Sequence, residues 1–335
     1  MSLKSFVLFL VTGLLCCIEI FCSNPLSLQS EYDQFSIYLL NGQNITTEKA
    51  EKYELSDLQL QAQPWLSIND IEFYDFSTHC IYLKEDISSL FGGDSITIFN
   101  EIFGTPFVLV ADGERCYLGS FYTSISSWMP KGPRIEDIDW WQYPKDVIRI
   151  NRAAYFDGAD FSTFEDVRND NRIRNGLLKE NKFHSGLSIQ LNHFDVINKP
   201  DTSTIIYTFT ITNNDNDNLY VPDPELMGSD LFHYYTNGIN LENETCHIWS
   251  EYKTTKNPIP YDGWDINWFT RIKSKQSLQR TVILKGYPNI PNGSYSSYFM
   301  YTGPKKIGKD SRTLQDGRLW IGEIISNVVE INVKN

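Results

Sequence analysis

The sequence predicts a small α+β unit followed by an all-β sandwich, and three observations support that prediction. Between residues 53 and 150, short apolar runs typical of strands alternate with one helical stretch, without a glycine-rich phosphate loop. From residue 185 onward, short strands separated by turn residues follow one another, which is typical of a sandwich. Aromatic residues make up 14% of the 335 residues, and such a content favours β-structure.

These changes along the chain divide it into five segments. We expect a signal peptide at residues 1–22, a tether at 23–52, the α+β unit at 53–150, a charged helical linker at 151–184 and the sandwich at 185–335. Because the linker is charged and the type of structure changes across it, we expect the two units to unfold separately.

The amino terminus has the pattern of an export signal. Lys4 precedes an apolar run at Phe6–Leu15, which has the length of a signal-peptide core and is too short to span a bilayer. We expect cleavage near Ser23, a secreted, periplasmic or cell-envelope location, and no transmembrane span in the mature chain. Lipid anchoring through Cys17 or Cys22 and a retained signal anchor remain alternatives.

Two hairpins and a broken helix account for most of the α+β unit. An apolar run at Phe107–Ala111, the tight-turn dipeptide Asp112-Gly113 and a return strand at Arg115–Phe121 predict the first hairpin. Helical spacing over residues 84–103 predicts a helix that breaks at Gly92-Gly93. The second hairpin is expected to have its strands at residues 71–76 and 80–83.

Four segments follow one another in a recognisable order. They are a capped segment at Leu66–Ile71, a strand at Ile81–Glu85, an apolar strand with a DG turn at Phe107–Gly113 and a return strand at Tyr117–Ser127. This order resembles the periplasmic head subdomain of the SecD/SecF protein-export proteins. The resemblance implies a similar fold and contact with extended polypeptide. The proton-driven transport of that family does not carry over, because its transmembrane bundle is missing here.

The cysteines suggest at most one disulfide in the exported chain. Removal of residues 1–22 leaves Cys80, Cys116 and Cys246, an odd number. The resemblance to the head subdomain implies that Cys80 and Cys116 lie in one sheet, where they could form a disulfide, with Cys246 free. The alternative is that both are buried thiols facing different sides of the sheet.

The second unit is expected to be an immunoglobulin-like sandwich. The run TFTITNND, a polar turn and a later GSYSSYFMY resemble the immunoglobulin-like modules of exported bacterial proteins, although the Cys–Trp–Cys spacing of antibody domains is missing. Two insertions, at residues 222–241 and 250–277, are longer than hairpin loops require and are candidate binding loops. Strands are expected at residues 187–196, 205–211, 220–221, 245–249, 278–284, 294–301 and 328–333.

Charge and motifs exclude several classes of function. The net charge of −13 repels a phosphate backbone, so nucleic acid is not an expected partner. Motifs for a metalloprotease, an α/β-hydrolase, a P-loop or a dinucleotide site do not occur, and we expect no catalytic residue, metal site or cofactor. Isolated histidines are most often structural; they stand at His79, His184, His193, His233 and His247.

Two groups of carboxylates could serve catalysis or metal binding, but each also has a purely structural explanation. Asp137 and Asp139 beside Trp140-Trp141 could serve a glycan-acting hydrolase, or the tryptophans could anchor a domain joint. A second group of four aspartates could supply oxygen ligands for Ca²⁺, or could simply belong to a solvated turn. Its members are Asp215, Asp217, Asp223 and Asp230.

Aromatic residues concentrate in the two insertions, where they suit contact with polypeptide or carbohydrate, or form a small core beneath the loops. The sequence therefore predicts a non-enzymatic binding or scaffolding protein. A glycan-acting hydrolase, and a peptidase inhibitor or export-accessory factor, are the alternatives. The aromatic group comprises Tyr234, Tyr235, Trp249, Tyr252, Tyr261, Trp264 and Trp268.

Overall fold

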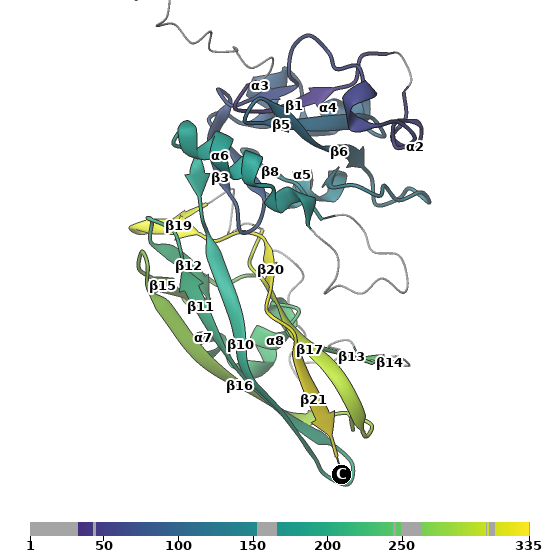
Figure 1. Cartoon of the computed structure of the whole chain (residues 1–335). Helices are drawn as coiled ribbons and strands as arrows, with labels where there is room; N and C mark the ends of the chain where they lie inside the picture. Colours follow the sequence, from purple (N-terminus) through teal and green to yellow (C-terminus); the bar gives the residue numbers. More distant parts are fainter. Residues whose placement is uncertain are drawn as a thin grey trace, which may run out of the picture.

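The computed structural model describes residues 33–42, 45–152, 166–243, 246–248, 263–305, 307 and 312–334. The chain is rich in β-structure, as expected, and forms two units that lie one above the other (Figure 1). The expected signal peptide, with Cys17 and Cys22, lies outside the described residues. No helix in the described part of the chain has both the length and the apolar character needed to cross a bilayer.

The first unit begins with a five-stranded sheet that contains the expected DG hairpin. Asp112 and Gly113 have φ of 53° and 78°, the left-handed conformation of a tight hairpin turn, so this prediction is confirmed. In the sheet, β1 pairs antiparallel with β5, whereas β7 pairs parallel with the end of β6. The strands, in spatial order, are β2 (Leu66–Ser67), β1 (Phe35–Leu39), β5 (Pro106–Ala111), β6 (Glu114–Tyr122) and β7 (Arg134–Glu136).

A second sheet of four strands packs against the inner face of the first sheet. Residues from both sheets and from helices α3, α4 and α6 form one buried core, which includes Phe35, Tyr74 and Phe107. The helix expected at residues 84–103 is present and breaks at the two glycines. The elements are β8 (Val147–Arg149), β4 (Cys80–Leu83), β3 (Ile71–Asp75), β9 (Phe183–His184), α3 (Ile87–Phe91), α4 (Ser95–Ile102) and α6 (Asn171–Lys179).

Two expected boundaries are corrected by the structure. The described part of the expected tether supplies β1, which lies between β2 and β5 and is buried along most of its length. The short helix expected in the linker is present as α6, but its Ile173 and Leu177 are fully buried in the core of the first unit. The charged residues of α6 are typical of an exposed helix, but they surround a narrow apolar stripe that is completely buried.

The outer face of the first sheet is covered by a short segment that precedes β2. Helix α2 (Thr47–Ala50) and the 3-10 turn η1 (Leu55–Asp57) lie there, and Ala50 and Leu58 pack on Val108 and Val110 of β5. Another short helix, α5 (Asp137–Gln142), follows β7, and the 3-10 turn η2 (Val167–Asn169) precedes α6. The first sheet is therefore covered on both faces.

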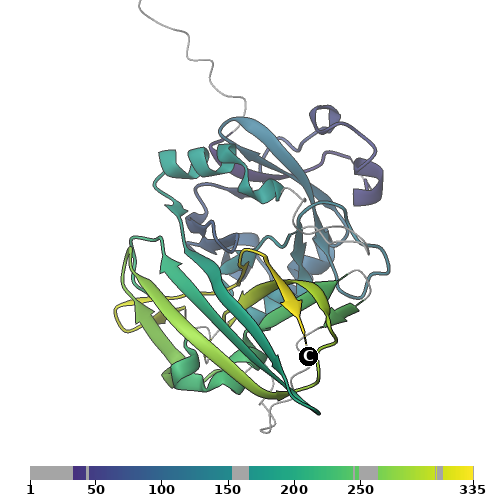
Figure 2. The same ribbon diagram turned by 60° about the horizontal axis from the view of Figure 1, so that its bottom comes forward.

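The second unit encloses its own core between long strands. Every other residue of β11 is buried, and those residues face side chains from β13, β17 and α8. Figure 2 shows the long strands side by side. The third sheet is β10 (Leu187–Asn198), β11 (Ser203–Asn213) and β16 (Ser277–Tyr287); the fifth is β14 (Cys246–Ile248), β13 (Ile239–Asn243), β17 (Gly293–Thr302) and β20 (Glu323–Ile325), with β21 (Val329–Val333) on β17.

The fourth sheet lies at the end of the second unit that faces the first unit. It consists of β15 (Phe269–Ile272), β12 (Leu219–Pro222), β19 (Gly317–Leu319) and β18 (Thr313–Leu314). Each strand expected in this half has a counterpart in the structure. The insertion at residues 222–241 is not only a loop, because it contains helices α7 (Pro224–Met227) and α8 (Ser229–Tyr235).

The two units share a buried apolar cluster, which we call the seam. Tyr82 and Val147 from the second sheet pack with Tyr220, Leu319 and Ile321 from the second unit. The chain passes from one unit to the other directly after β9, at Gly186, where a Cβ would lie 2.1 Å from the Ser77 hydroxyl. The units are thus packed together, not joined by a free linker.

Candidate functional site

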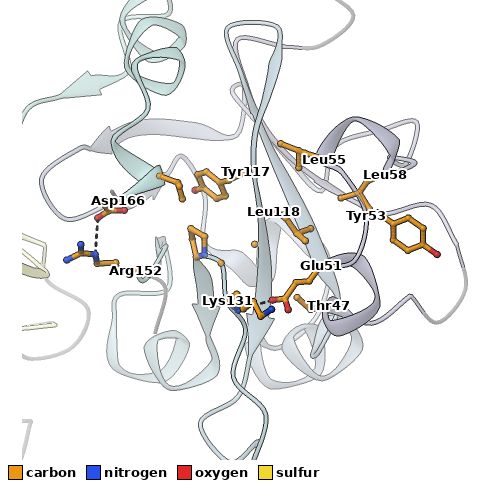
Figure 3. Close-up of a pocket in the computed structure, with 14 residues that line it drawn as sticks. Thr47, Glu51, Tyr53, Leu55, Leu58, Tyr117, Leu118, Lys131, Arg152 and Asp166 are labelled. Carbon is orange, nitrogen blue, oxygen red and sulfur yellow. Dashed lines mark hydrogen bonds and ion pairs between the residues drawn. The ribbon is translucent and has the colours of Figure 1, made fainter. Parts of the chain in front are cut away.

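A groove opens beside strand β6 on the first unit, as Figure 3 shows. It has a volume of about 350 Å³, which is within the usual range of ligand sites. Side chains of Leu55, Leu58, Leu118, Pro133 and Val167 make it largely apolar. The other described residues that line it are Thr47, Glu51, Tyr53, Tyr117, Gly119, Lys131, Gly132, Arg152 and Asp166.

One wall of the groove is held in place by Arg115 of β6. Its guanidinium donates hydrogen bonds to the carbonyl oxygens of Leu55 and Leu58, each at 2.7 Å, and to that of Ser56 at 3.0 Å. The segment that follows α2 is thereby fixed to the sheet, although it contains only one turn of 3-10 helix. The wall is preformed, which reduces the entropy that a ligand must remove on binding.

The opposite wall contains one buried hydroxyl that no described residue satisfies. Tyr117 is 5% exposed, and its hydroxyl oxygen has no hydrogen-bond partner among the described residues. Burial raises the pKa of this phenol well above its usual value, so the group remains a neutral donor. The hydroxyl oxygen is itself buried in the core behind the groove, so only other atoms of the Tyr117 side chain line the groove.

The two carboxylates of the groove are both engaged. Glu51 accepts a hydrogen bond of 2.8 Å from the backbone amide of Lys131. Asp166 forms ion pairs with Arg168 at 2.6 Å and Arg152 at 3.8 Å. Burial alone would raise the pKa of Asp166, but the hydrogen bonds and charge of Arg168 outweigh it and lower the pKa to about 2. Asp166 is therefore ionised at neutral pH and is a poor proton donor.

A chain of charged side chains crosses the seam. Arg318 of β19 is 7% exposed and reaches Asp75 of β3 at 2.8 Å and Asp215 at 2.9 Å. Its guanidinium lies over the rings of Phe73 and Tyr82, with centroids 5.1 and 5.4 Å away. Two carboxylates and two aromatic faces thus compensate the charge of this buried cation, although its Nε has no hydrogen-bond partner among the described residues.

His184 extends this chain of charges. Its Nδ1 lies 3.0 Å from Asp215 and 3.6 Å from Asp217. Burial favours a raised pKa for Asp215, but His184 and Arg318 together lower it to about 2. His184, Asp215 and Asp217 lie close enough together to hold a metal ion. Arg318 already neutralises Asp215, however, so we interpret the group as an ion-pair network.

The other carboxylates of the expected calcium group are not brought to this place. Asp223 is buried, pairs with Arg280 at 2.8 Å and caps α7. Asp230 lies in the first turn of α8. The expected oxygen-ligand set is therefore divided between separate structural roles.

Asp137 and Asp139 have separate partners at the amino-terminal end of α5. Asp137 accepts hydrogen bonds from the Thr123 hydroxyl and the Ser124 amide, and Asp139 is 3% exposed and bound to Asn151 and Lys305. The Asp139–Lys305 ion pair, 3.2 Å long, is another contact across the seam. The side chains of Trp140 and Trp141 lie outside the described residues.

The expected aromatic surface is in part a packed cluster. Tyr235, Trp264 and Trp268 contact one another edge to face, with centroids 4.9 to 6.3 Å apart, and pack on the cores of the second unit and the seam. Tyr234 is 48% exposed. Trp249, Tyr252 and Tyr261 lie outside the described residues.

The remaining histidines with described side chains are structural or exposed. His79 is buried with its Nδ1 2.9 Å from the Tyr74 hydroxyl, and burial and Arg168 lower its pKa. His233 is fully buried, which lowers its pKa to about 4. His193 is exposed on β10, and the side chain of His247 lies outside the described residues.

The possible Cys80–Cys116 disulfide is not formed in this structure, where both thiols are free. Cys80 lies in β4 of the second sheet and packs in the seam, whereas Cys116 lies in β6 of the first sheet. The resemblance implied one sheet, but the two strands belong to facing sheets. Their side chains join different apolar clusters. The side chain of Cys246 lies outside the described residues.

No pattern in the sequence predicted the groove. Its lining comes from five separate places in the chain, and no motif connects them. The one local signal was the DG turn, which defines β6 and so the strand beside which the groove forms. No protein-family model matches this chain, and no curated protein is significantly similar to it in sequence.

Proposed function

We propose that this chain is a non-catalytic binding protein of the cell envelope or exterior, and that the groove beside β6 is its binding site. The observation that supports this most directly is the groove itself, which has aliphatic walls and a preformed shape. Among the described residues, its lining contains no histidine or cysteine, and the two carboxylates there are engaged. Such a site favours binding over acid–base or nucleophilic chemistry.

The chemistry of the groove favours a polypeptide partner over a carbohydrate. Sugar sites combine aromatic platforms with several free polar groups, whereas both described carboxylates of this groove are already engaged and Leu55, Leu58 and Val167 form aliphatic parts of its wall. The net charge of −13 favours a basic partner and disfavours nucleic acid.

We propose that the second unit is an immunoglobulin-like sandwich that serves as a rigid support, and that the first is a head-like α+β unit. Long strands around one core and a seam with several buried ion pairs support that division of roles. We further propose that residues 1–22 direct export and are removed. Intact mass of the exported protein tests this, since a diacylglycerol adduct or an uncleaved chain would contradict it.

The binding site is tested with a neutral apolar dye, Nile red, and the purified full-length protein. Val167 lines the groove and is 44% exposed, so Val167→Asp should weaken dye binding about tenfold without unfolding the chain. Val328 is also 44% exposed but lies in the second unit, and Val328→Asp is the matched control. Equal dye binding by the two variants would contradict the proposed site.

A further inference from the structure

The groove runs past the edge of a strand and not over the face of a sheet. Tyr117 and Leu118 are neighbours in β6, so their side chains point to opposite faces of the first sheet. Both side chains nevertheless line the groove, as does the next residue of the strand, Gly119. A ligand in this position lies alongside the backbone of β6.

That edge of β6 is only partly paired within the described residues. On the side away from β5, the only described strand is β7, which pairs with Ser120–Tyr122 alone. The amide of Ser120 donates to the Pro133 carbonyl on this side, so the alternation of a strand places the amide of Leu118 on the same side. The carbonyl of Leu118 is already approached by Gly132, where a Cβ would lie only 2.3 Å away.

The walls on either side of the edge suit the alternating side chains of an extended peptide. Leu55, Leu58 and Leu118 form an apolar site on the outer side, and Tyr117 and Val167 form another on the inner side. An added strand sends successive side chains to these two sides and offers carbonyl oxygens to the β6 edge. Small ligands such as sugars or nucleotides make no use of this geometry.

The charges favour a partner strand with basic residues. The groove itself carries both signs of charge, with Glu51 and Asp166 against Lys131 and Arg152, so the preference comes from the net charge of −13 of the whole chain. Long-range attraction therefore accelerates the approach of a cationic segment.

We propose that the groove binds an extended, apolar and basic polypeptide segment by strand addition, with the Leu118 amide donating to a carbonyl of the partner. This inference rests on the proposed binding function and adds the class of partner and the mode of binding. An added strand extends the first sheet next to β6, and its apolar side chains enter the two walls.

The probe is a short synthetic peptide with a central run of valines flanked by lysines, labelled for fluorescence anisotropy, with the full-length protein. Leu118→Pro removes the amide that faces the groove, and an edge position tolerates proline because that amide is not used by β5. Leu118→Ala is the matched control for loss of the side chain. We expect Leu118→Pro to bind the peptide about tenfold more weakly than Leu118→Ala.

Two further measurements keep the test independent of how well the proline variant folds. On the wild-type protein, a peptide methylated at the backbone amides of alternate residues should lose binding in one of its two registers. Hydrogen exchange of residues 115–119 should slow when the unmethylated peptide is present. A glutamate–valine peptide should bind more weakly than the lysine–valine peptide.

The outcomes separate this inference from the proposed function. Nile red binding without peptide binding overturns strand addition and leaves the groove as a site for apolar ligands. Peptide binding that is equal in Leu118→Pro and Leu118→Ala, and unaffected by methylation, overturns the backbone pairing. Absence of both dye and peptide binding overturns the proposed function as well.

Discussion

Replacement of Arg318 by methionine tests whether the seam couples the two units. The change keeps most of the side-chain volume and removes the cation between Asp75 and Asp215, which are 0% and 3% exposed. Removal of one partner from a buried ion pair costs about 3–5 kcal/mol, because the other charge is left without compensation. The lowered pKa of Asp215 gives a consistent scale: a value near 2 in place of 3.8 corresponds to about 2 kcal/mol, a stabilisation that His184 and Arg318 provide together.

Urea denaturation of the full-length protein at neutral pH measures the effect. Because the seam is buried and ion-paired, we now expect the wild-type units to unfold in one transition, contrary to the expectation from the charged linker. Arg318→Met should lower the free energy of unfolding by about 3–5 kcal/mol. Arg271→Met is the control, since Arg271 is 37% exposed beside the half-exposed Asp316, and it should cost less than about 1 kcal/mol. A loss for Arg318→Met no larger than that of the control would refute the reasoning.

Three other predictions concern stability and reactivity. Leu177→Ala should destabilise the chain by about 2–5 kcal/mol because Leu177 is fully buried in the first core, whereas Leu178→Ala next to it, at a 49% exposed position, should change urea stability by less than about 0.5 kcal/mol; similar losses would place α6 outside the core. Asp166 and Asp215 have pKa values lowered to about 2, so their stabilisation is complete above the unfolded pKa near 3.8 and is lost as the pH falls toward 2. The free energy of unfolding should drop by about 3 kcal/mol between about pH 5 and about pH 2.5, and a constant value would contradict the ion pairs. Burial raises the pKa of Cys80 and of Cys116 to about 12, so both thiols should resist iodoacetamide in the native protein and react after denaturation without a reductant; recovery of a linked Cys80–Cys116 peptide would falsify this.

Local patterns in the sequence predicted individual elements well. The dipeptide Asp112-Gly113 requires positive φ at both residues, so it specifies a tight hairpin wherever the strands lie. The alternation in Ile205–Ile211 likewise appears as buried and partly exposed residues along β11. These signals depend on near neighbours in the chain, and the sequence alone contains them.

Elements whose place depends on distant partners were harder to predict. The strand β1 was expected to belong to a tether, because its polar surroundings hide five residues that become the middle of a sheet. The charged helix α6 was expected to be a linker, although Ile173 and Leu177 complete the first core. Whether the narrow apolar stripe of α6 is buried depends on which elements pack against it. Those elements are strands that lie far from α6 in the sequence.

The sequence by itself determined the order of strands and helices, the acidic charge and the position of a β-rich second half. Only the tertiary structure decided that Asp75, Arg318 and Asp215 form one ion-pair network across the seam, although up to 243 residues separate them from one another. It also decided that Leu55, Leu118 and Val167 enclose one groove. Both sites join residues that share no local pattern, because they depend on how two sheets and two units pack and not on the conformational preferences of neighbouring residues.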